Sequence, residues 1–391
     1  MTAADKLSLA MMVPHTGAVD GVQWAAQHLT SGLARREHAV DLLFHMAGTN
    51  HDAWQSITRS RVRLSSPGIV PRSPLASAKT LASVIKAGRH HRWDAVYAHR
   101  IDMVNTAAAA ALASDARLIL YLHNEPASWF SAEKRTMVGV RAVDWVLNPS
   151  RFMLDRWQAA GMDGARMSVI PYGVDMTRFR PMDRLARNRG RALRGIDPDA
   201  IVVVYAGRLE RVKGVHVLAD AFAQYAAEES RARLVLVGGI GESMGACGND
   251  YVTQLRGQTD TARTIWWGVT TDVAPVLGLA DVMVIPSLWQ EPSAVSAVEG
   301  LATGIPVLVS RSGGMPEHLE GGFEDLVFEQ DSVSALADKL RRYGGWRDEM
   351  PRLGDDIRNH AVNRRSLDAS VLATEELLRT LMTEQRRRRG G

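Results

Sequence analysis

The sequence has little of what marks a disulfide-rich or membrane-spanning protein. Its one cysteine, Cys247, excludes an internal disulfide and a cysteine-rich metal site, and it fits a reducing compartment. No apolar run approaches the ~18 residues of a transmembrane helix, and the N-terminus has no charged-then-apolar signal pattern. These absences lead us to expect a soluble protein of the cytoplasm.

Several common ligand-binding patterns are also missing. The ten tryptophans do not interleave with basic residues along one stretch, so nucleic acid is not an expected partner. The chain has no G-K-[ST] phosphate loop and no H-E-x-x-H zinc helix. Gly239 and Gly241 have the dinucleotide-binding spacing, but Met244 stands where the third glycine belongs. A lone partial match of this kind does not indicate a dinucleotide site.

Length and composition predict two domains. With 391 residues, 46% of them hydrophobic, the chain exceeds one ordinary core and can fill two. Much of its net charge of +4 lies in an Arg-rich segment, 178–194, and in a terminal run, 386–389. Such runs are typical of solvated linkers or tails. We interpret the Arg-rich segment, which contains Pro181, as part of a domain boundary.

Both halves of the chain repeat a strand-helix rhythm. Short apolar runs predict strands at 7–13, 39–44, 95–98, 118–122 and 143–147, and again at 201–205, 234–237, 282–285 and 305–309. Apolar residues at helical spacing predict helices between them, such as 104–113, 152–160 and 215–225. This alternation predicts an α/β protein with two doubly wound parallel sheets.

One stretch of the second half, residues 281–318, carries the most specific chemistry. It predicts a strand, a helix over 293–302 and a second strand, which together form one βαβ unit. Pro292 suits the first helical position, which leaves Glu291 outside the helix and Glu299 two turns inside it. The N–H groups of the helix start would lie between the two carboxylates and could bind phosphate oxygens. The alternative is an ordinary crossover whose acidic residues face water.

This pattern, Glu291, seven residues, Glu299 and then SGGMPE, resembles the nucleotide-sugar site of the retaining glycosyltransferases of family 4. The resemblance implies the GT-B fold, in which two Rossmann-like domains face each other across a cleft. It implies that the carboxylates grip hydroxyls of the sugar and the ribose while backbone amides hold the diphosphate. The nucleotide-sugar contacts would come from Glu291, Pro292, Ser293, Ala294, Val295 and Glu299, and Glu291 is also predicted to be catalytic.

A second stretch, AGRLERVKG, follows the first strand of the second half. It places Arg208 and Lys213 at the carboxyl edge of the sheet, where such folds bind ligands. The stretch resembles the family pattern in which an Arg and a Lys neutralise the diphosphate. Alone, such a pair would more often be two solvated cations, but the acidic motif follows at the expected distance. We therefore predict that both residues are catalytic.

The first half offers further candidates. His99 in VYAHR and His123 in LYLHN each follow a strand, and family members use such a histidine near the donor sugar. We predict His123 as catalytic, with His99 and Asn124 as acceptor or loop candidates. A structural role is the alternative for both histidines. Resemblance to the family runs from about residue 7 to residue 318. No single motif in this range is specific for the family, but the motifs taken together are.

The chain departs from the family pattern in two places. The early loop often carries paired glycines and then a Glu, whereas here Asp20 precedes Gly21, Val22 and Gln23. Gly21 is a nucleotide-sugar-binding candidate, while Gly17 could supply flexibility and Asp20 could face a polar acceptor. After Pro292, many members have a bulkier aromatic residue and a glycine, where this chain has Ser293 and Ala294. The shape of the sugar pocket is therefore not predictable from the family.

These observations predict a retaining, metal-independent hexosyltransferase. Domain boundaries are predicted at 1–178 for the acceptor domain and 179–365 for the nucleotide-sugar-binding domain. Residues 366–391 are predicted as a helix that crosses back toward the N-terminal domain and ends in a basic tail. The expected partners are a nucleotide sugar and a small-molecule acceptor such as a natural-product core. No cofactor or metal is expected, because the acidic metal-binding pair of the other major glycosyltransferase fold is not identifiable. The chain is expected to be a monomer or homodimer.

Several alternatives stay open. UDP-linked hexose or N-acetylhexosamine is preferred over a GDP-linked sugar on family frequency, not on any residue. An envelope-lipid acceptor is a second possibility, because the helix before residue 94 ends in a basic cluster that includes Lys86 and Arg89. Its apolar face is small and lacks aromatic anchors, so a membrane surface is not the preferred partner. A glycoside hydrolase using Glu291 and Glu299, or a non-catalytic nucleotide-sugar binder, are the remaining alternatives.

Overall fold

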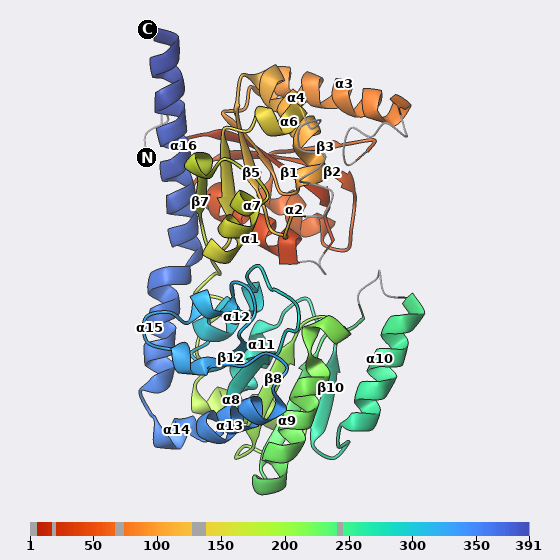
Figure 1. The fold of residues 1–391 in the computed structure, drawn as a ribbon, viewed down its shortest axis with the longest axis vertical. Coiled ribbons are helices and arrows are strands. Elements are labelled where there is room, and N and C mark those ends of the chain that lie inside the picture. The colour runs from red at the N-terminus through yellow and green to blue at the C-terminus, as the bar shows by residue number, and fades with distance from the viewer. Residues whose placement is uncertain (1–5, 18–20, 67–73, 127–137, 241–244, 391) are drawn as a thin grey trace. The chain divides into compact units, whose positions relative to one another are not determined.

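The structure of the protein is a computed structural model that describes residues 6–17, 21–66, 74–126, 138–240 and 245–390, with only the backbone described in 245–248 and 385–390. The chain forms two compact units (Figure 1). Unit 1 comprises Met1–Gly173 and Leu367–Gly391, and unit 2 comprises Val174–Ser366. The sequence analysis placed the corresponding boundaries at 178/179 and 365/366.

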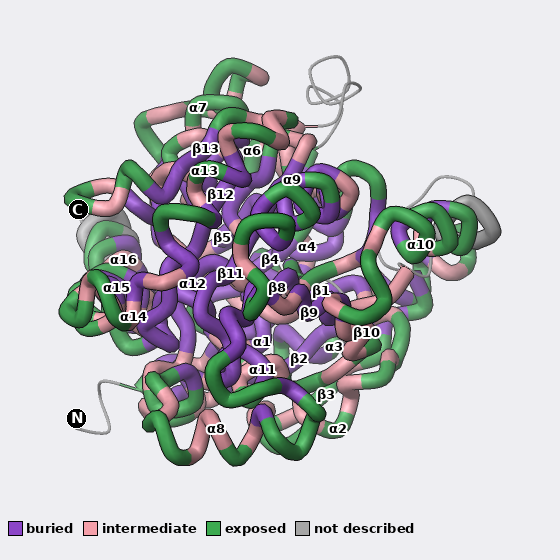
Figure 2. Tube along the Cα trace, turned by 90° about the horizontal axis from the view of Figure 1, so that it is seen from below, coloured by how far each residue is buried: buried purple, intermediate pink, exposed green. Residues whose placement is uncertain are grey.

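Unit 1 is built on a parallel sheet with the order β3-β2-β1-β4-β5-β6-β7 among the described residues. Its strands are β1 (Ser8–His15), β2 (Ala39–Met46), β3 (Ser60–Arg63), β4 (Ala95–Ala98), β5 (Arg117–Tyr121), β6 (Trp145–Asn148) and β7 (Met167–Val169). The central strands β1, β4 and β5 are buried along nearly their whole length, as Figure 2 shows. Continuous apolar runs such as β4, AVYA, are what a strand covered on both faces requires.

Helices cover both faces of this sheet. They are α1 (Gly21–Arg35), α2 (His51–Ile57), α3 (Pro74–His91), α4 (Val104–Ser114), α6 (Val138–Arg141), α7 (Arg151–Ala159) and α16 (Leu367–Gly390). One apolar cluster joins α3 and α4 to the sheet, and a separate one joins α1 and α2 to it. The strand order reverses between β1 and β4, as right-handed crossovers on opposite faces require. The prediction of a doubly wound α/β fold is confirmed.

The C-terminal helix α16 packs on α1 within unit 1, although more than 330 residues separate their sequences. Buried Glu375 accepts hydrogen bonds from Arg36 Nε at 2.6 Å and from His38 Nε2 at 2.6 Å. The Leu7 N–H donates to His38 Nδ1, so Nε2 carries the imidazole hydrogen. Burial opposes ionisation of Glu375, but the bonds from Arg36 and His38 hold its pKa below the usual range. These contacts fasten the returning helix to the segment between α1 and β2.

Unit 2 repeats the architecture with the order β10-β9-β8-β11-β12-β13. Its strands are β8 (Ile201–Ala206), β9 (Ala232–Val237), β10 (Thr264–Gly268), β11 (Val282–Ile285), β12 (Val307–Ser310) and β13 (Val327–Phe328). Its helices are α8 (Arg184–Ala192), α9 (Val215–Glu228), α10 (Gly245–Gln258), α11 (Ala274–Leu279), α12 (Val295–Ala302), α13 (Val333–Gly344), α14 (Trp346–Glu349) and α15 (Leu353–Arg365). The order reverses between β8 and β11, which is the switch point where open α/β sheets bind ligands.

The prediction that the Arg-rich segment is a solvated linker was wrong. Residues 184–192 form α8, which packs on α11, and the Arg191 side chain is buried. Arg191 donates to the carbonyls of Leu279, Pro198 and Ala200 and to the Asp281 carboxylate, so its five N–H groups find partners inside the unit. A buried guanidinium is tolerated when its donors are satisfied in this way. Charge composition alone does not reveal such partners.

The apolar side of α3 faces the core of unit 1. Val84 is fully buried, and Leu81 packs against the same apolar cluster. His91, at the basic end of the helix, lies 3.3 Å from Ser60 Oγ and stacks on Trp93. None of the helices in the described parts of the chain is both long enough and apolar enough to span a membrane.

Candidate functional site

The predicted site residues Lys213 and Glu291 meet at the carboxyl edge of the unit 2 sheet. Lys213 ends a 3-10 turn, η4 (Arg211–Lys213), that follows β8, and Glu291 lies in the loop after the neighbouring strand β11. Lys213 Nζ lies 2.6 Å from Glu291 Oε1. Both side chains are largely withdrawn from solvent, with exposures of 17% and 7%. A charged pair at the topological switch point is therefore in place.

The SGG sequence explains how Glu291 is held. The Gly314 N–H donates to the Glu291 carbonyl at 2.8 Å, and the Glu291 N–H donates to Ser312 Oγ at 3.3 Å. Gly313 has φ of +54°, and a Cβ there would lie 2.2 Å from the Glu291 carbonyl oxygen. Only glycine fits such a left-handed, crowded position. The backbone of Glu291 is thus fixed by the loop that follows β12.

The helix of the βαβ unit begins later than predicted. Helix α12 spans Val295–Ala302 with Ala294 at its N-cap, so Pro292 is not its first residue. The Glu291 carbonyl accepts from Gly314 and is therefore not used to start a helix. Glu291 lies outside the helix as predicted, but Glu299 lies little more than one turn inside it, not two. Among the described residues no side chain caps the first turn, and since the Ala297 N–H donates to the Ala294 carbonyl, the N–H groups of Val295 and Ser296 remain for a ligand.

Glu299 is a half-buried carboxylate with no hydrogen-bond or ion-pair partner for its side chain among the described residues. Burial raises the pKa of Glu299 to about 7, while the Arg178 guanidinium opposes the rise and Asp272 adds to it. Arg178 and Asp272 are paired with each other at 3.0 Å. A carboxylate left without donors in this environment is suited to accept hydrogen bonds from a ligand.

Arg208 does not join the Lys213 and Glu291 pair. Its Nη1 donates to Glu210 Oε1 at 2.6 Å, and its side chain is 40% exposed. The Tyr205 hydroxyl donates to the Arg208 carbonyl at 2.6 Å. Burial and then Glu291 raise the pKa of Tyr205 well above its usual value, whereas Arg208 opposes the rise. Arg208 and Glu291 therefore both lie within electrostatic reach of the same buried phenol.

The loop between Glu291 and α12 is tied to the end of the SGGMPEH sequence. Buried Ser293 has its Oγ 3.1 Å from His318 Nε2, and the His318 carbonyl accepts from His360 Nε2 at 2.8 Å. Burial lowers the pKa of His318 well below its usual value, so the ring is neutral. Ser293 thus bonds within the protein, while Ala294 and Val295 contribute backbone at the helix start.

In unit 1, His99 and His123 form a buried chain with Tyr172. His99 Nδ1 lies 2.9 Å from His123 Nε2, and His123 Nδ1 lies 2.7 Å from the Tyr172 hydroxyl. Burial lowers the pKa of His99 to about 3, and burial with His99 lowers the pKa of His123 well below its ordinary value. Both rings are neutral, and both nitrogens of His123 already have protein partners. The catalytic role of His123 stays a prediction.

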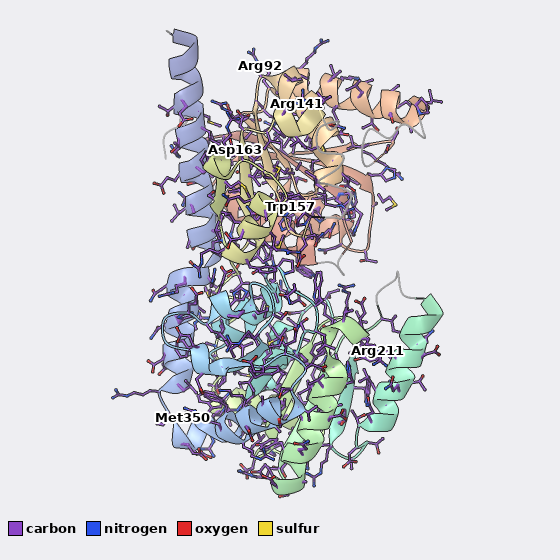
Figure 3. All side chains as sticks on the ribbon, in the orientation of Figure 1. Arg92, Arg141, Trp157, Asp163, Arg211 and Met350 are labelled. Atoms are coloured by element: carbon purple, nitrogen blue, oxygen red, sulfur yellow. The ribbon has the colours of Figure 1, made fainter. Side chains whose placement is uncertain are left out.

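The other unit 1 candidates are more dispersed. Gly21 begins α1, and a Cβ there would meet no described atom within 4 Å. Gly17 follows β1, where its N–H donates to His15 Nδ1 at 3.1 Å. Asn124 is exposed, and its carbonyl accepts from Nε1 of Trp157, which Figure 3 labels. Asp20 lies outside the described residues.

Sequence reasoning missed several contacts of the site. The Ser287 hydroxyl donates to Glu291 Oε1 at 2.5 Å, and the Trp289 ring lies 5.0 Å from Lys213 Nζ, in cation–π range. Both residues stand inside the SLWQE sequence just before Glu291, and that proximity is the only signal that points to them. Within the described ranges no group of three or more His, Cys, Asp or Glu side chains could hold a metal ion.

Two family models match consecutive parts of the chain. Residues 19–178 match the model described as Glycosyltransferase Family 4, and residues 200–343 match the model described as Glycosyl transferases group 1. The first match falls largely in unit 1 and the second in unit 2, so each unit is similar to a glycosyltransferase family model of its own.

Curated relatives share moderate identity. A D-inositol 3-phosphate glycosyltransferase of Nocardia farcinica is 29% identical over 267 residues, which cover 67% of this chain and 58% of the relative. The protein of the same name from Actinosynnema mirum is 33% identical over 186 residues, 46% of this chain and 44% of the relative. The alignment thus spans less than two thirds of these relatives' length.

Solved structures share the fold at lower identity. HepE of Anabaena, in complex with UDP and glucose, matches with a TM-score of 0.80 and 19% identity, covering 95% of this chain and 99% of that one. Sucrose-phosphate synthase of Thermosynechococcus elongatus matches with a TM-score of 0.72 and 20% identity, covering 97% of this chain and 100% of the other.

Proposed function

Because the chain belongs to the family 4 glycosyltransferases and has their GT-B fold, we propose that it transfers a hexose-type sugar from a nucleoside diphosphate sugar to a small-molecule acceptor. The observation that carries this proposal is the arrangement of Lys213, Glu291 and the uncapped start of α12 at one edge of unit 2. Transfer proceeds with retention of the anomeric configuration.

The leaving diphosphate is the group that this edge is built to stabilise. Lys213 supplies a positive charge that is largely shielded from water, and the first turn of α12 supplies N–H groups. Arg208, which is 40% exposed and bonded to Glu210, adds a second cation when it turns to the ligand. Fixed charges aimed at charge that grows in the transition state are usually the largest catalytic contribution. No metal ion is needed for this step.

Each of the two carboxylates contacts a different part of the donor. Glu299, which lacks a partner among the described residues, accepts hydrogen bonds from the two ribose hydroxyls. Glu291, fixed by Ser287 and the SGG loop, contacts the transferred sugar. This division gives Lys213 and Arg208 a role that a glycoside hydrolase would not need.

We propose a UDP-linked hexose or N-acetylhexosamine as the donor and a small polar metabolite as the acceptor. Structures of the similar HepE protein contain UDP or UDP-glucose, which supports the choice of base. The names of the relatives, D-inositol 3-phosphate glycosyltransferase, support a small hydroxylated acceptor that carries a phosphate. A GDP-linked donor and a lipid acceptor are the alternatives.

Release of free nucleotide tests the proposed function. We expect UDP to appear when the protein is given a UDP-hexose together with inositol phosphate, and the same rate in a metal chelator. Product with an inverted anomeric centre would remove the mechanism. Sugar release without any nucleotide donor would indicate a hydrolase, and tight donor binding without turnover would indicate a binding protein.

The affinity for the donor should depend on pH through Glu299. The pKa of this carboxyl is about 7 in the free protein, so it is mostly protonated below pH 7 and cannot accept from both ribose hydroxyls. Burial disfavours the ionised form of Glu299. The contribution of this residue to the stability of the free protein is therefore fully present when the carboxyl is protonated and is lost as pH rises through 7. We expect UDP-glucose to bind ~10-fold more weakly at pH 6 than at pH 8, because one pKa unit is a factor of ten.

Calorimetry with UDP-glucose measures this effect, because its diphosphate does not titrate in this range. The control is Glu299→Gln, which cannot ionise and should show a flat profile. An unchanged pH profile in Glu299→Gln would show that another group is responsible.

A further inference from the structure

Four arginines gather at the amino edge of the unit 2 sheet, the edge opposite the Lys213 and Glu291 pair. Three of them, Arg184, Arg187 and Arg191, follow one face of α8 at helical spacing, and the fourth, Arg347, comes from α14. Figure 1 shows α8 and α14 at the same end of unit 2. Asp281, directly before β11, is the carboxylate that pairs with Arg191 and Arg347 and acts electrostatically on Arg187. We call these four residues the arginine cluster.

Two members of the cluster already form hydrogen bonds to the two carboxylate oxygens of Asp281. Arg191 Nη2 lies 2.7 Å from Asp281 Oδ2, and Arg347 Nε lies 2.7 Å from Oδ1. The Val202 N–H also donates to Oδ2 at 2.8 Å. Arg347 Nη2 donates to the Ala280 carbonyl, which leaves Arg347 Nη1 without a partner among the described residues. The carboxylate therefore has little capacity left for another guanidinium.

Arg187 is the half-buried member of the cluster whose guanidinium has no partner among the described residues. Within the described part of the chain its guanidinium makes no hydrogen bond or ion pair, and its Nε is buried away from water. The residue is half-buried. Burial and then the nearby Arg347 lower the pKa of Arg187 to about 10, with Arg191 and Arg184 acting in the same direction and Asp281 opposing. A buried donor that lacks a partner costs free energy, which a bound acceptor would recover.

We propose that the arginine cluster is an anion site, in which Arg187 and Arg347 hold a phosphate group. Among the described residues, three guanidinium groups and one carboxylate act on Arg187, so four guanidinium groups in all share one carboxylate. Planar guanidinium groups bind phosphate oxygens with two parallel N–H bonds, so a dianionic phosphate satisfies the open donors of both residues. A singly charged carboxylate compensates less of the excess charge. The site is separate from the edge that holds Lys213 and Glu291.

Thermal unfolding of the full chain with inorganic phosphate tests this site. At constant ionic strength, phosphate at ten times its Kd should raise the Tm of the wild type by about 2 °C, and acetate should do so much less. Arg187→Gln should lose this response. Its Tm without phosphate should equal or exceed that of the wild type, because the change removes an uncompensated charge. A residue needed only for packing would not give that combination.

Matched variants separate this site from others. Arg189→Gln removes an exposed arginine of the same helix and should keep the full phosphate response. Lys213→Ala, in the proposed donor site, should keep it as well. Arg187→Lys retains the charge but not the fork and should weaken phosphate binding by about 10-fold. A wild type without a saturable response, or a response that survives in Arg187→Gln, would overturn the proposal. Loss of the response in Lys213→Ala alone would place the phosphate in the donor site and would also overturn it.

Phosphate esters are tested in the same way, because the cellular source of the anion can be free phosphate or a phosphorylated metabolite. A sugar phosphate that gives a larger shift than inorganic phosphate in the wild type, and none in Arg187→Gln, identifies the ester as the ligand. Equal shifts identify the phosphate group alone. This result does not depend on the proposed transferase activity, since the readout is stability and not turnover.

Discussion

Lys213→Ala should lower the turnover of the donor by roughly 10²- to 10³-fold, the range seen when one fixed electrostatic donor is removed from an active site. Two effects of the substitution both lower the turnover. The leaving diphosphate loses a cation that is only 17% exposed, and Glu291, only 7% exposed, loses the partner 2.6 Å from its Oε1. An unpaired carboxylate at this position would also repel the phosphates. Both effects act on the step in which charge grows.

Arg211→Ala is the matched control for this prediction. Arg211, which Figure 3 labels, belongs to the same 3-10 turn. Its side chain donates to Gln254 of α10 and lies over the Tyr251 ring. Steady-state release of UDP should therefore change little in Arg211→Ala. The unfolding midpoint of each variant shows whether the fold is intact. Wild-type turnover in Lys213→Ala would show that the diphosphate lies elsewhere.

The strands of the fold were predictable where both faces of a sheet are covered. The predicted ranges 95–98 and 282–285 match β4 and β11 to the residue, because a buried strand in a parallel sheet is an uninterrupted apolar run. Strands β3 and β10 were not predicted. The residues of β3 alternate between half-buried and exposed, and β10 contains the half-buried Trp266 and Trp267. Edge strands of this kind give no continuous apolar signal.

The site was predictable as a set of residues but not as a set of contacts. The sequence placed Lys213 and Glu291 at the same sheet edge, since each follows a strand at the switch point. It could not show that they pair with each other, that Arg208 turns to Glu210, or that Gly314 holds the Glu291 carbonyl. The first and the last of these contacts join loops that lie far apart in the sequence, and the second depends on how one loop turns. Only the folded chain brings them together.

Glu291 and Glu299 should give opposite phenotypes when they are changed. Glu299→Ala removes the carboxylate that has no partner among the described residues, so free UDP and UDP-hexose should both bind about 10- to 150-fold more weakly. Glu291→Gln keeps the shape of a side chain that lies between Lys213 and Ser287. Free UDP should bind it almost as well as the wild type, while turnover falls by a similar factor.

Calorimetry with free UDP and with UDP-hexose, beside steady-state turnover, separates the two roles. Glu317→Gln serves as a control, because this carboxylate follows the same SGG loop but is not part of the proposed contacts. If Glu291→Gln weakens free UDP and Glu299→Ala does not, the sugar and ribose roles are exchanged. If both variants bind and turn over normally, residues 281–318 are an ordinary crossover. The distinction is physical: a contact to the ribose is made in every nucleotide complex, whereas a contact to the transferred sugar is made only when that sugar is present.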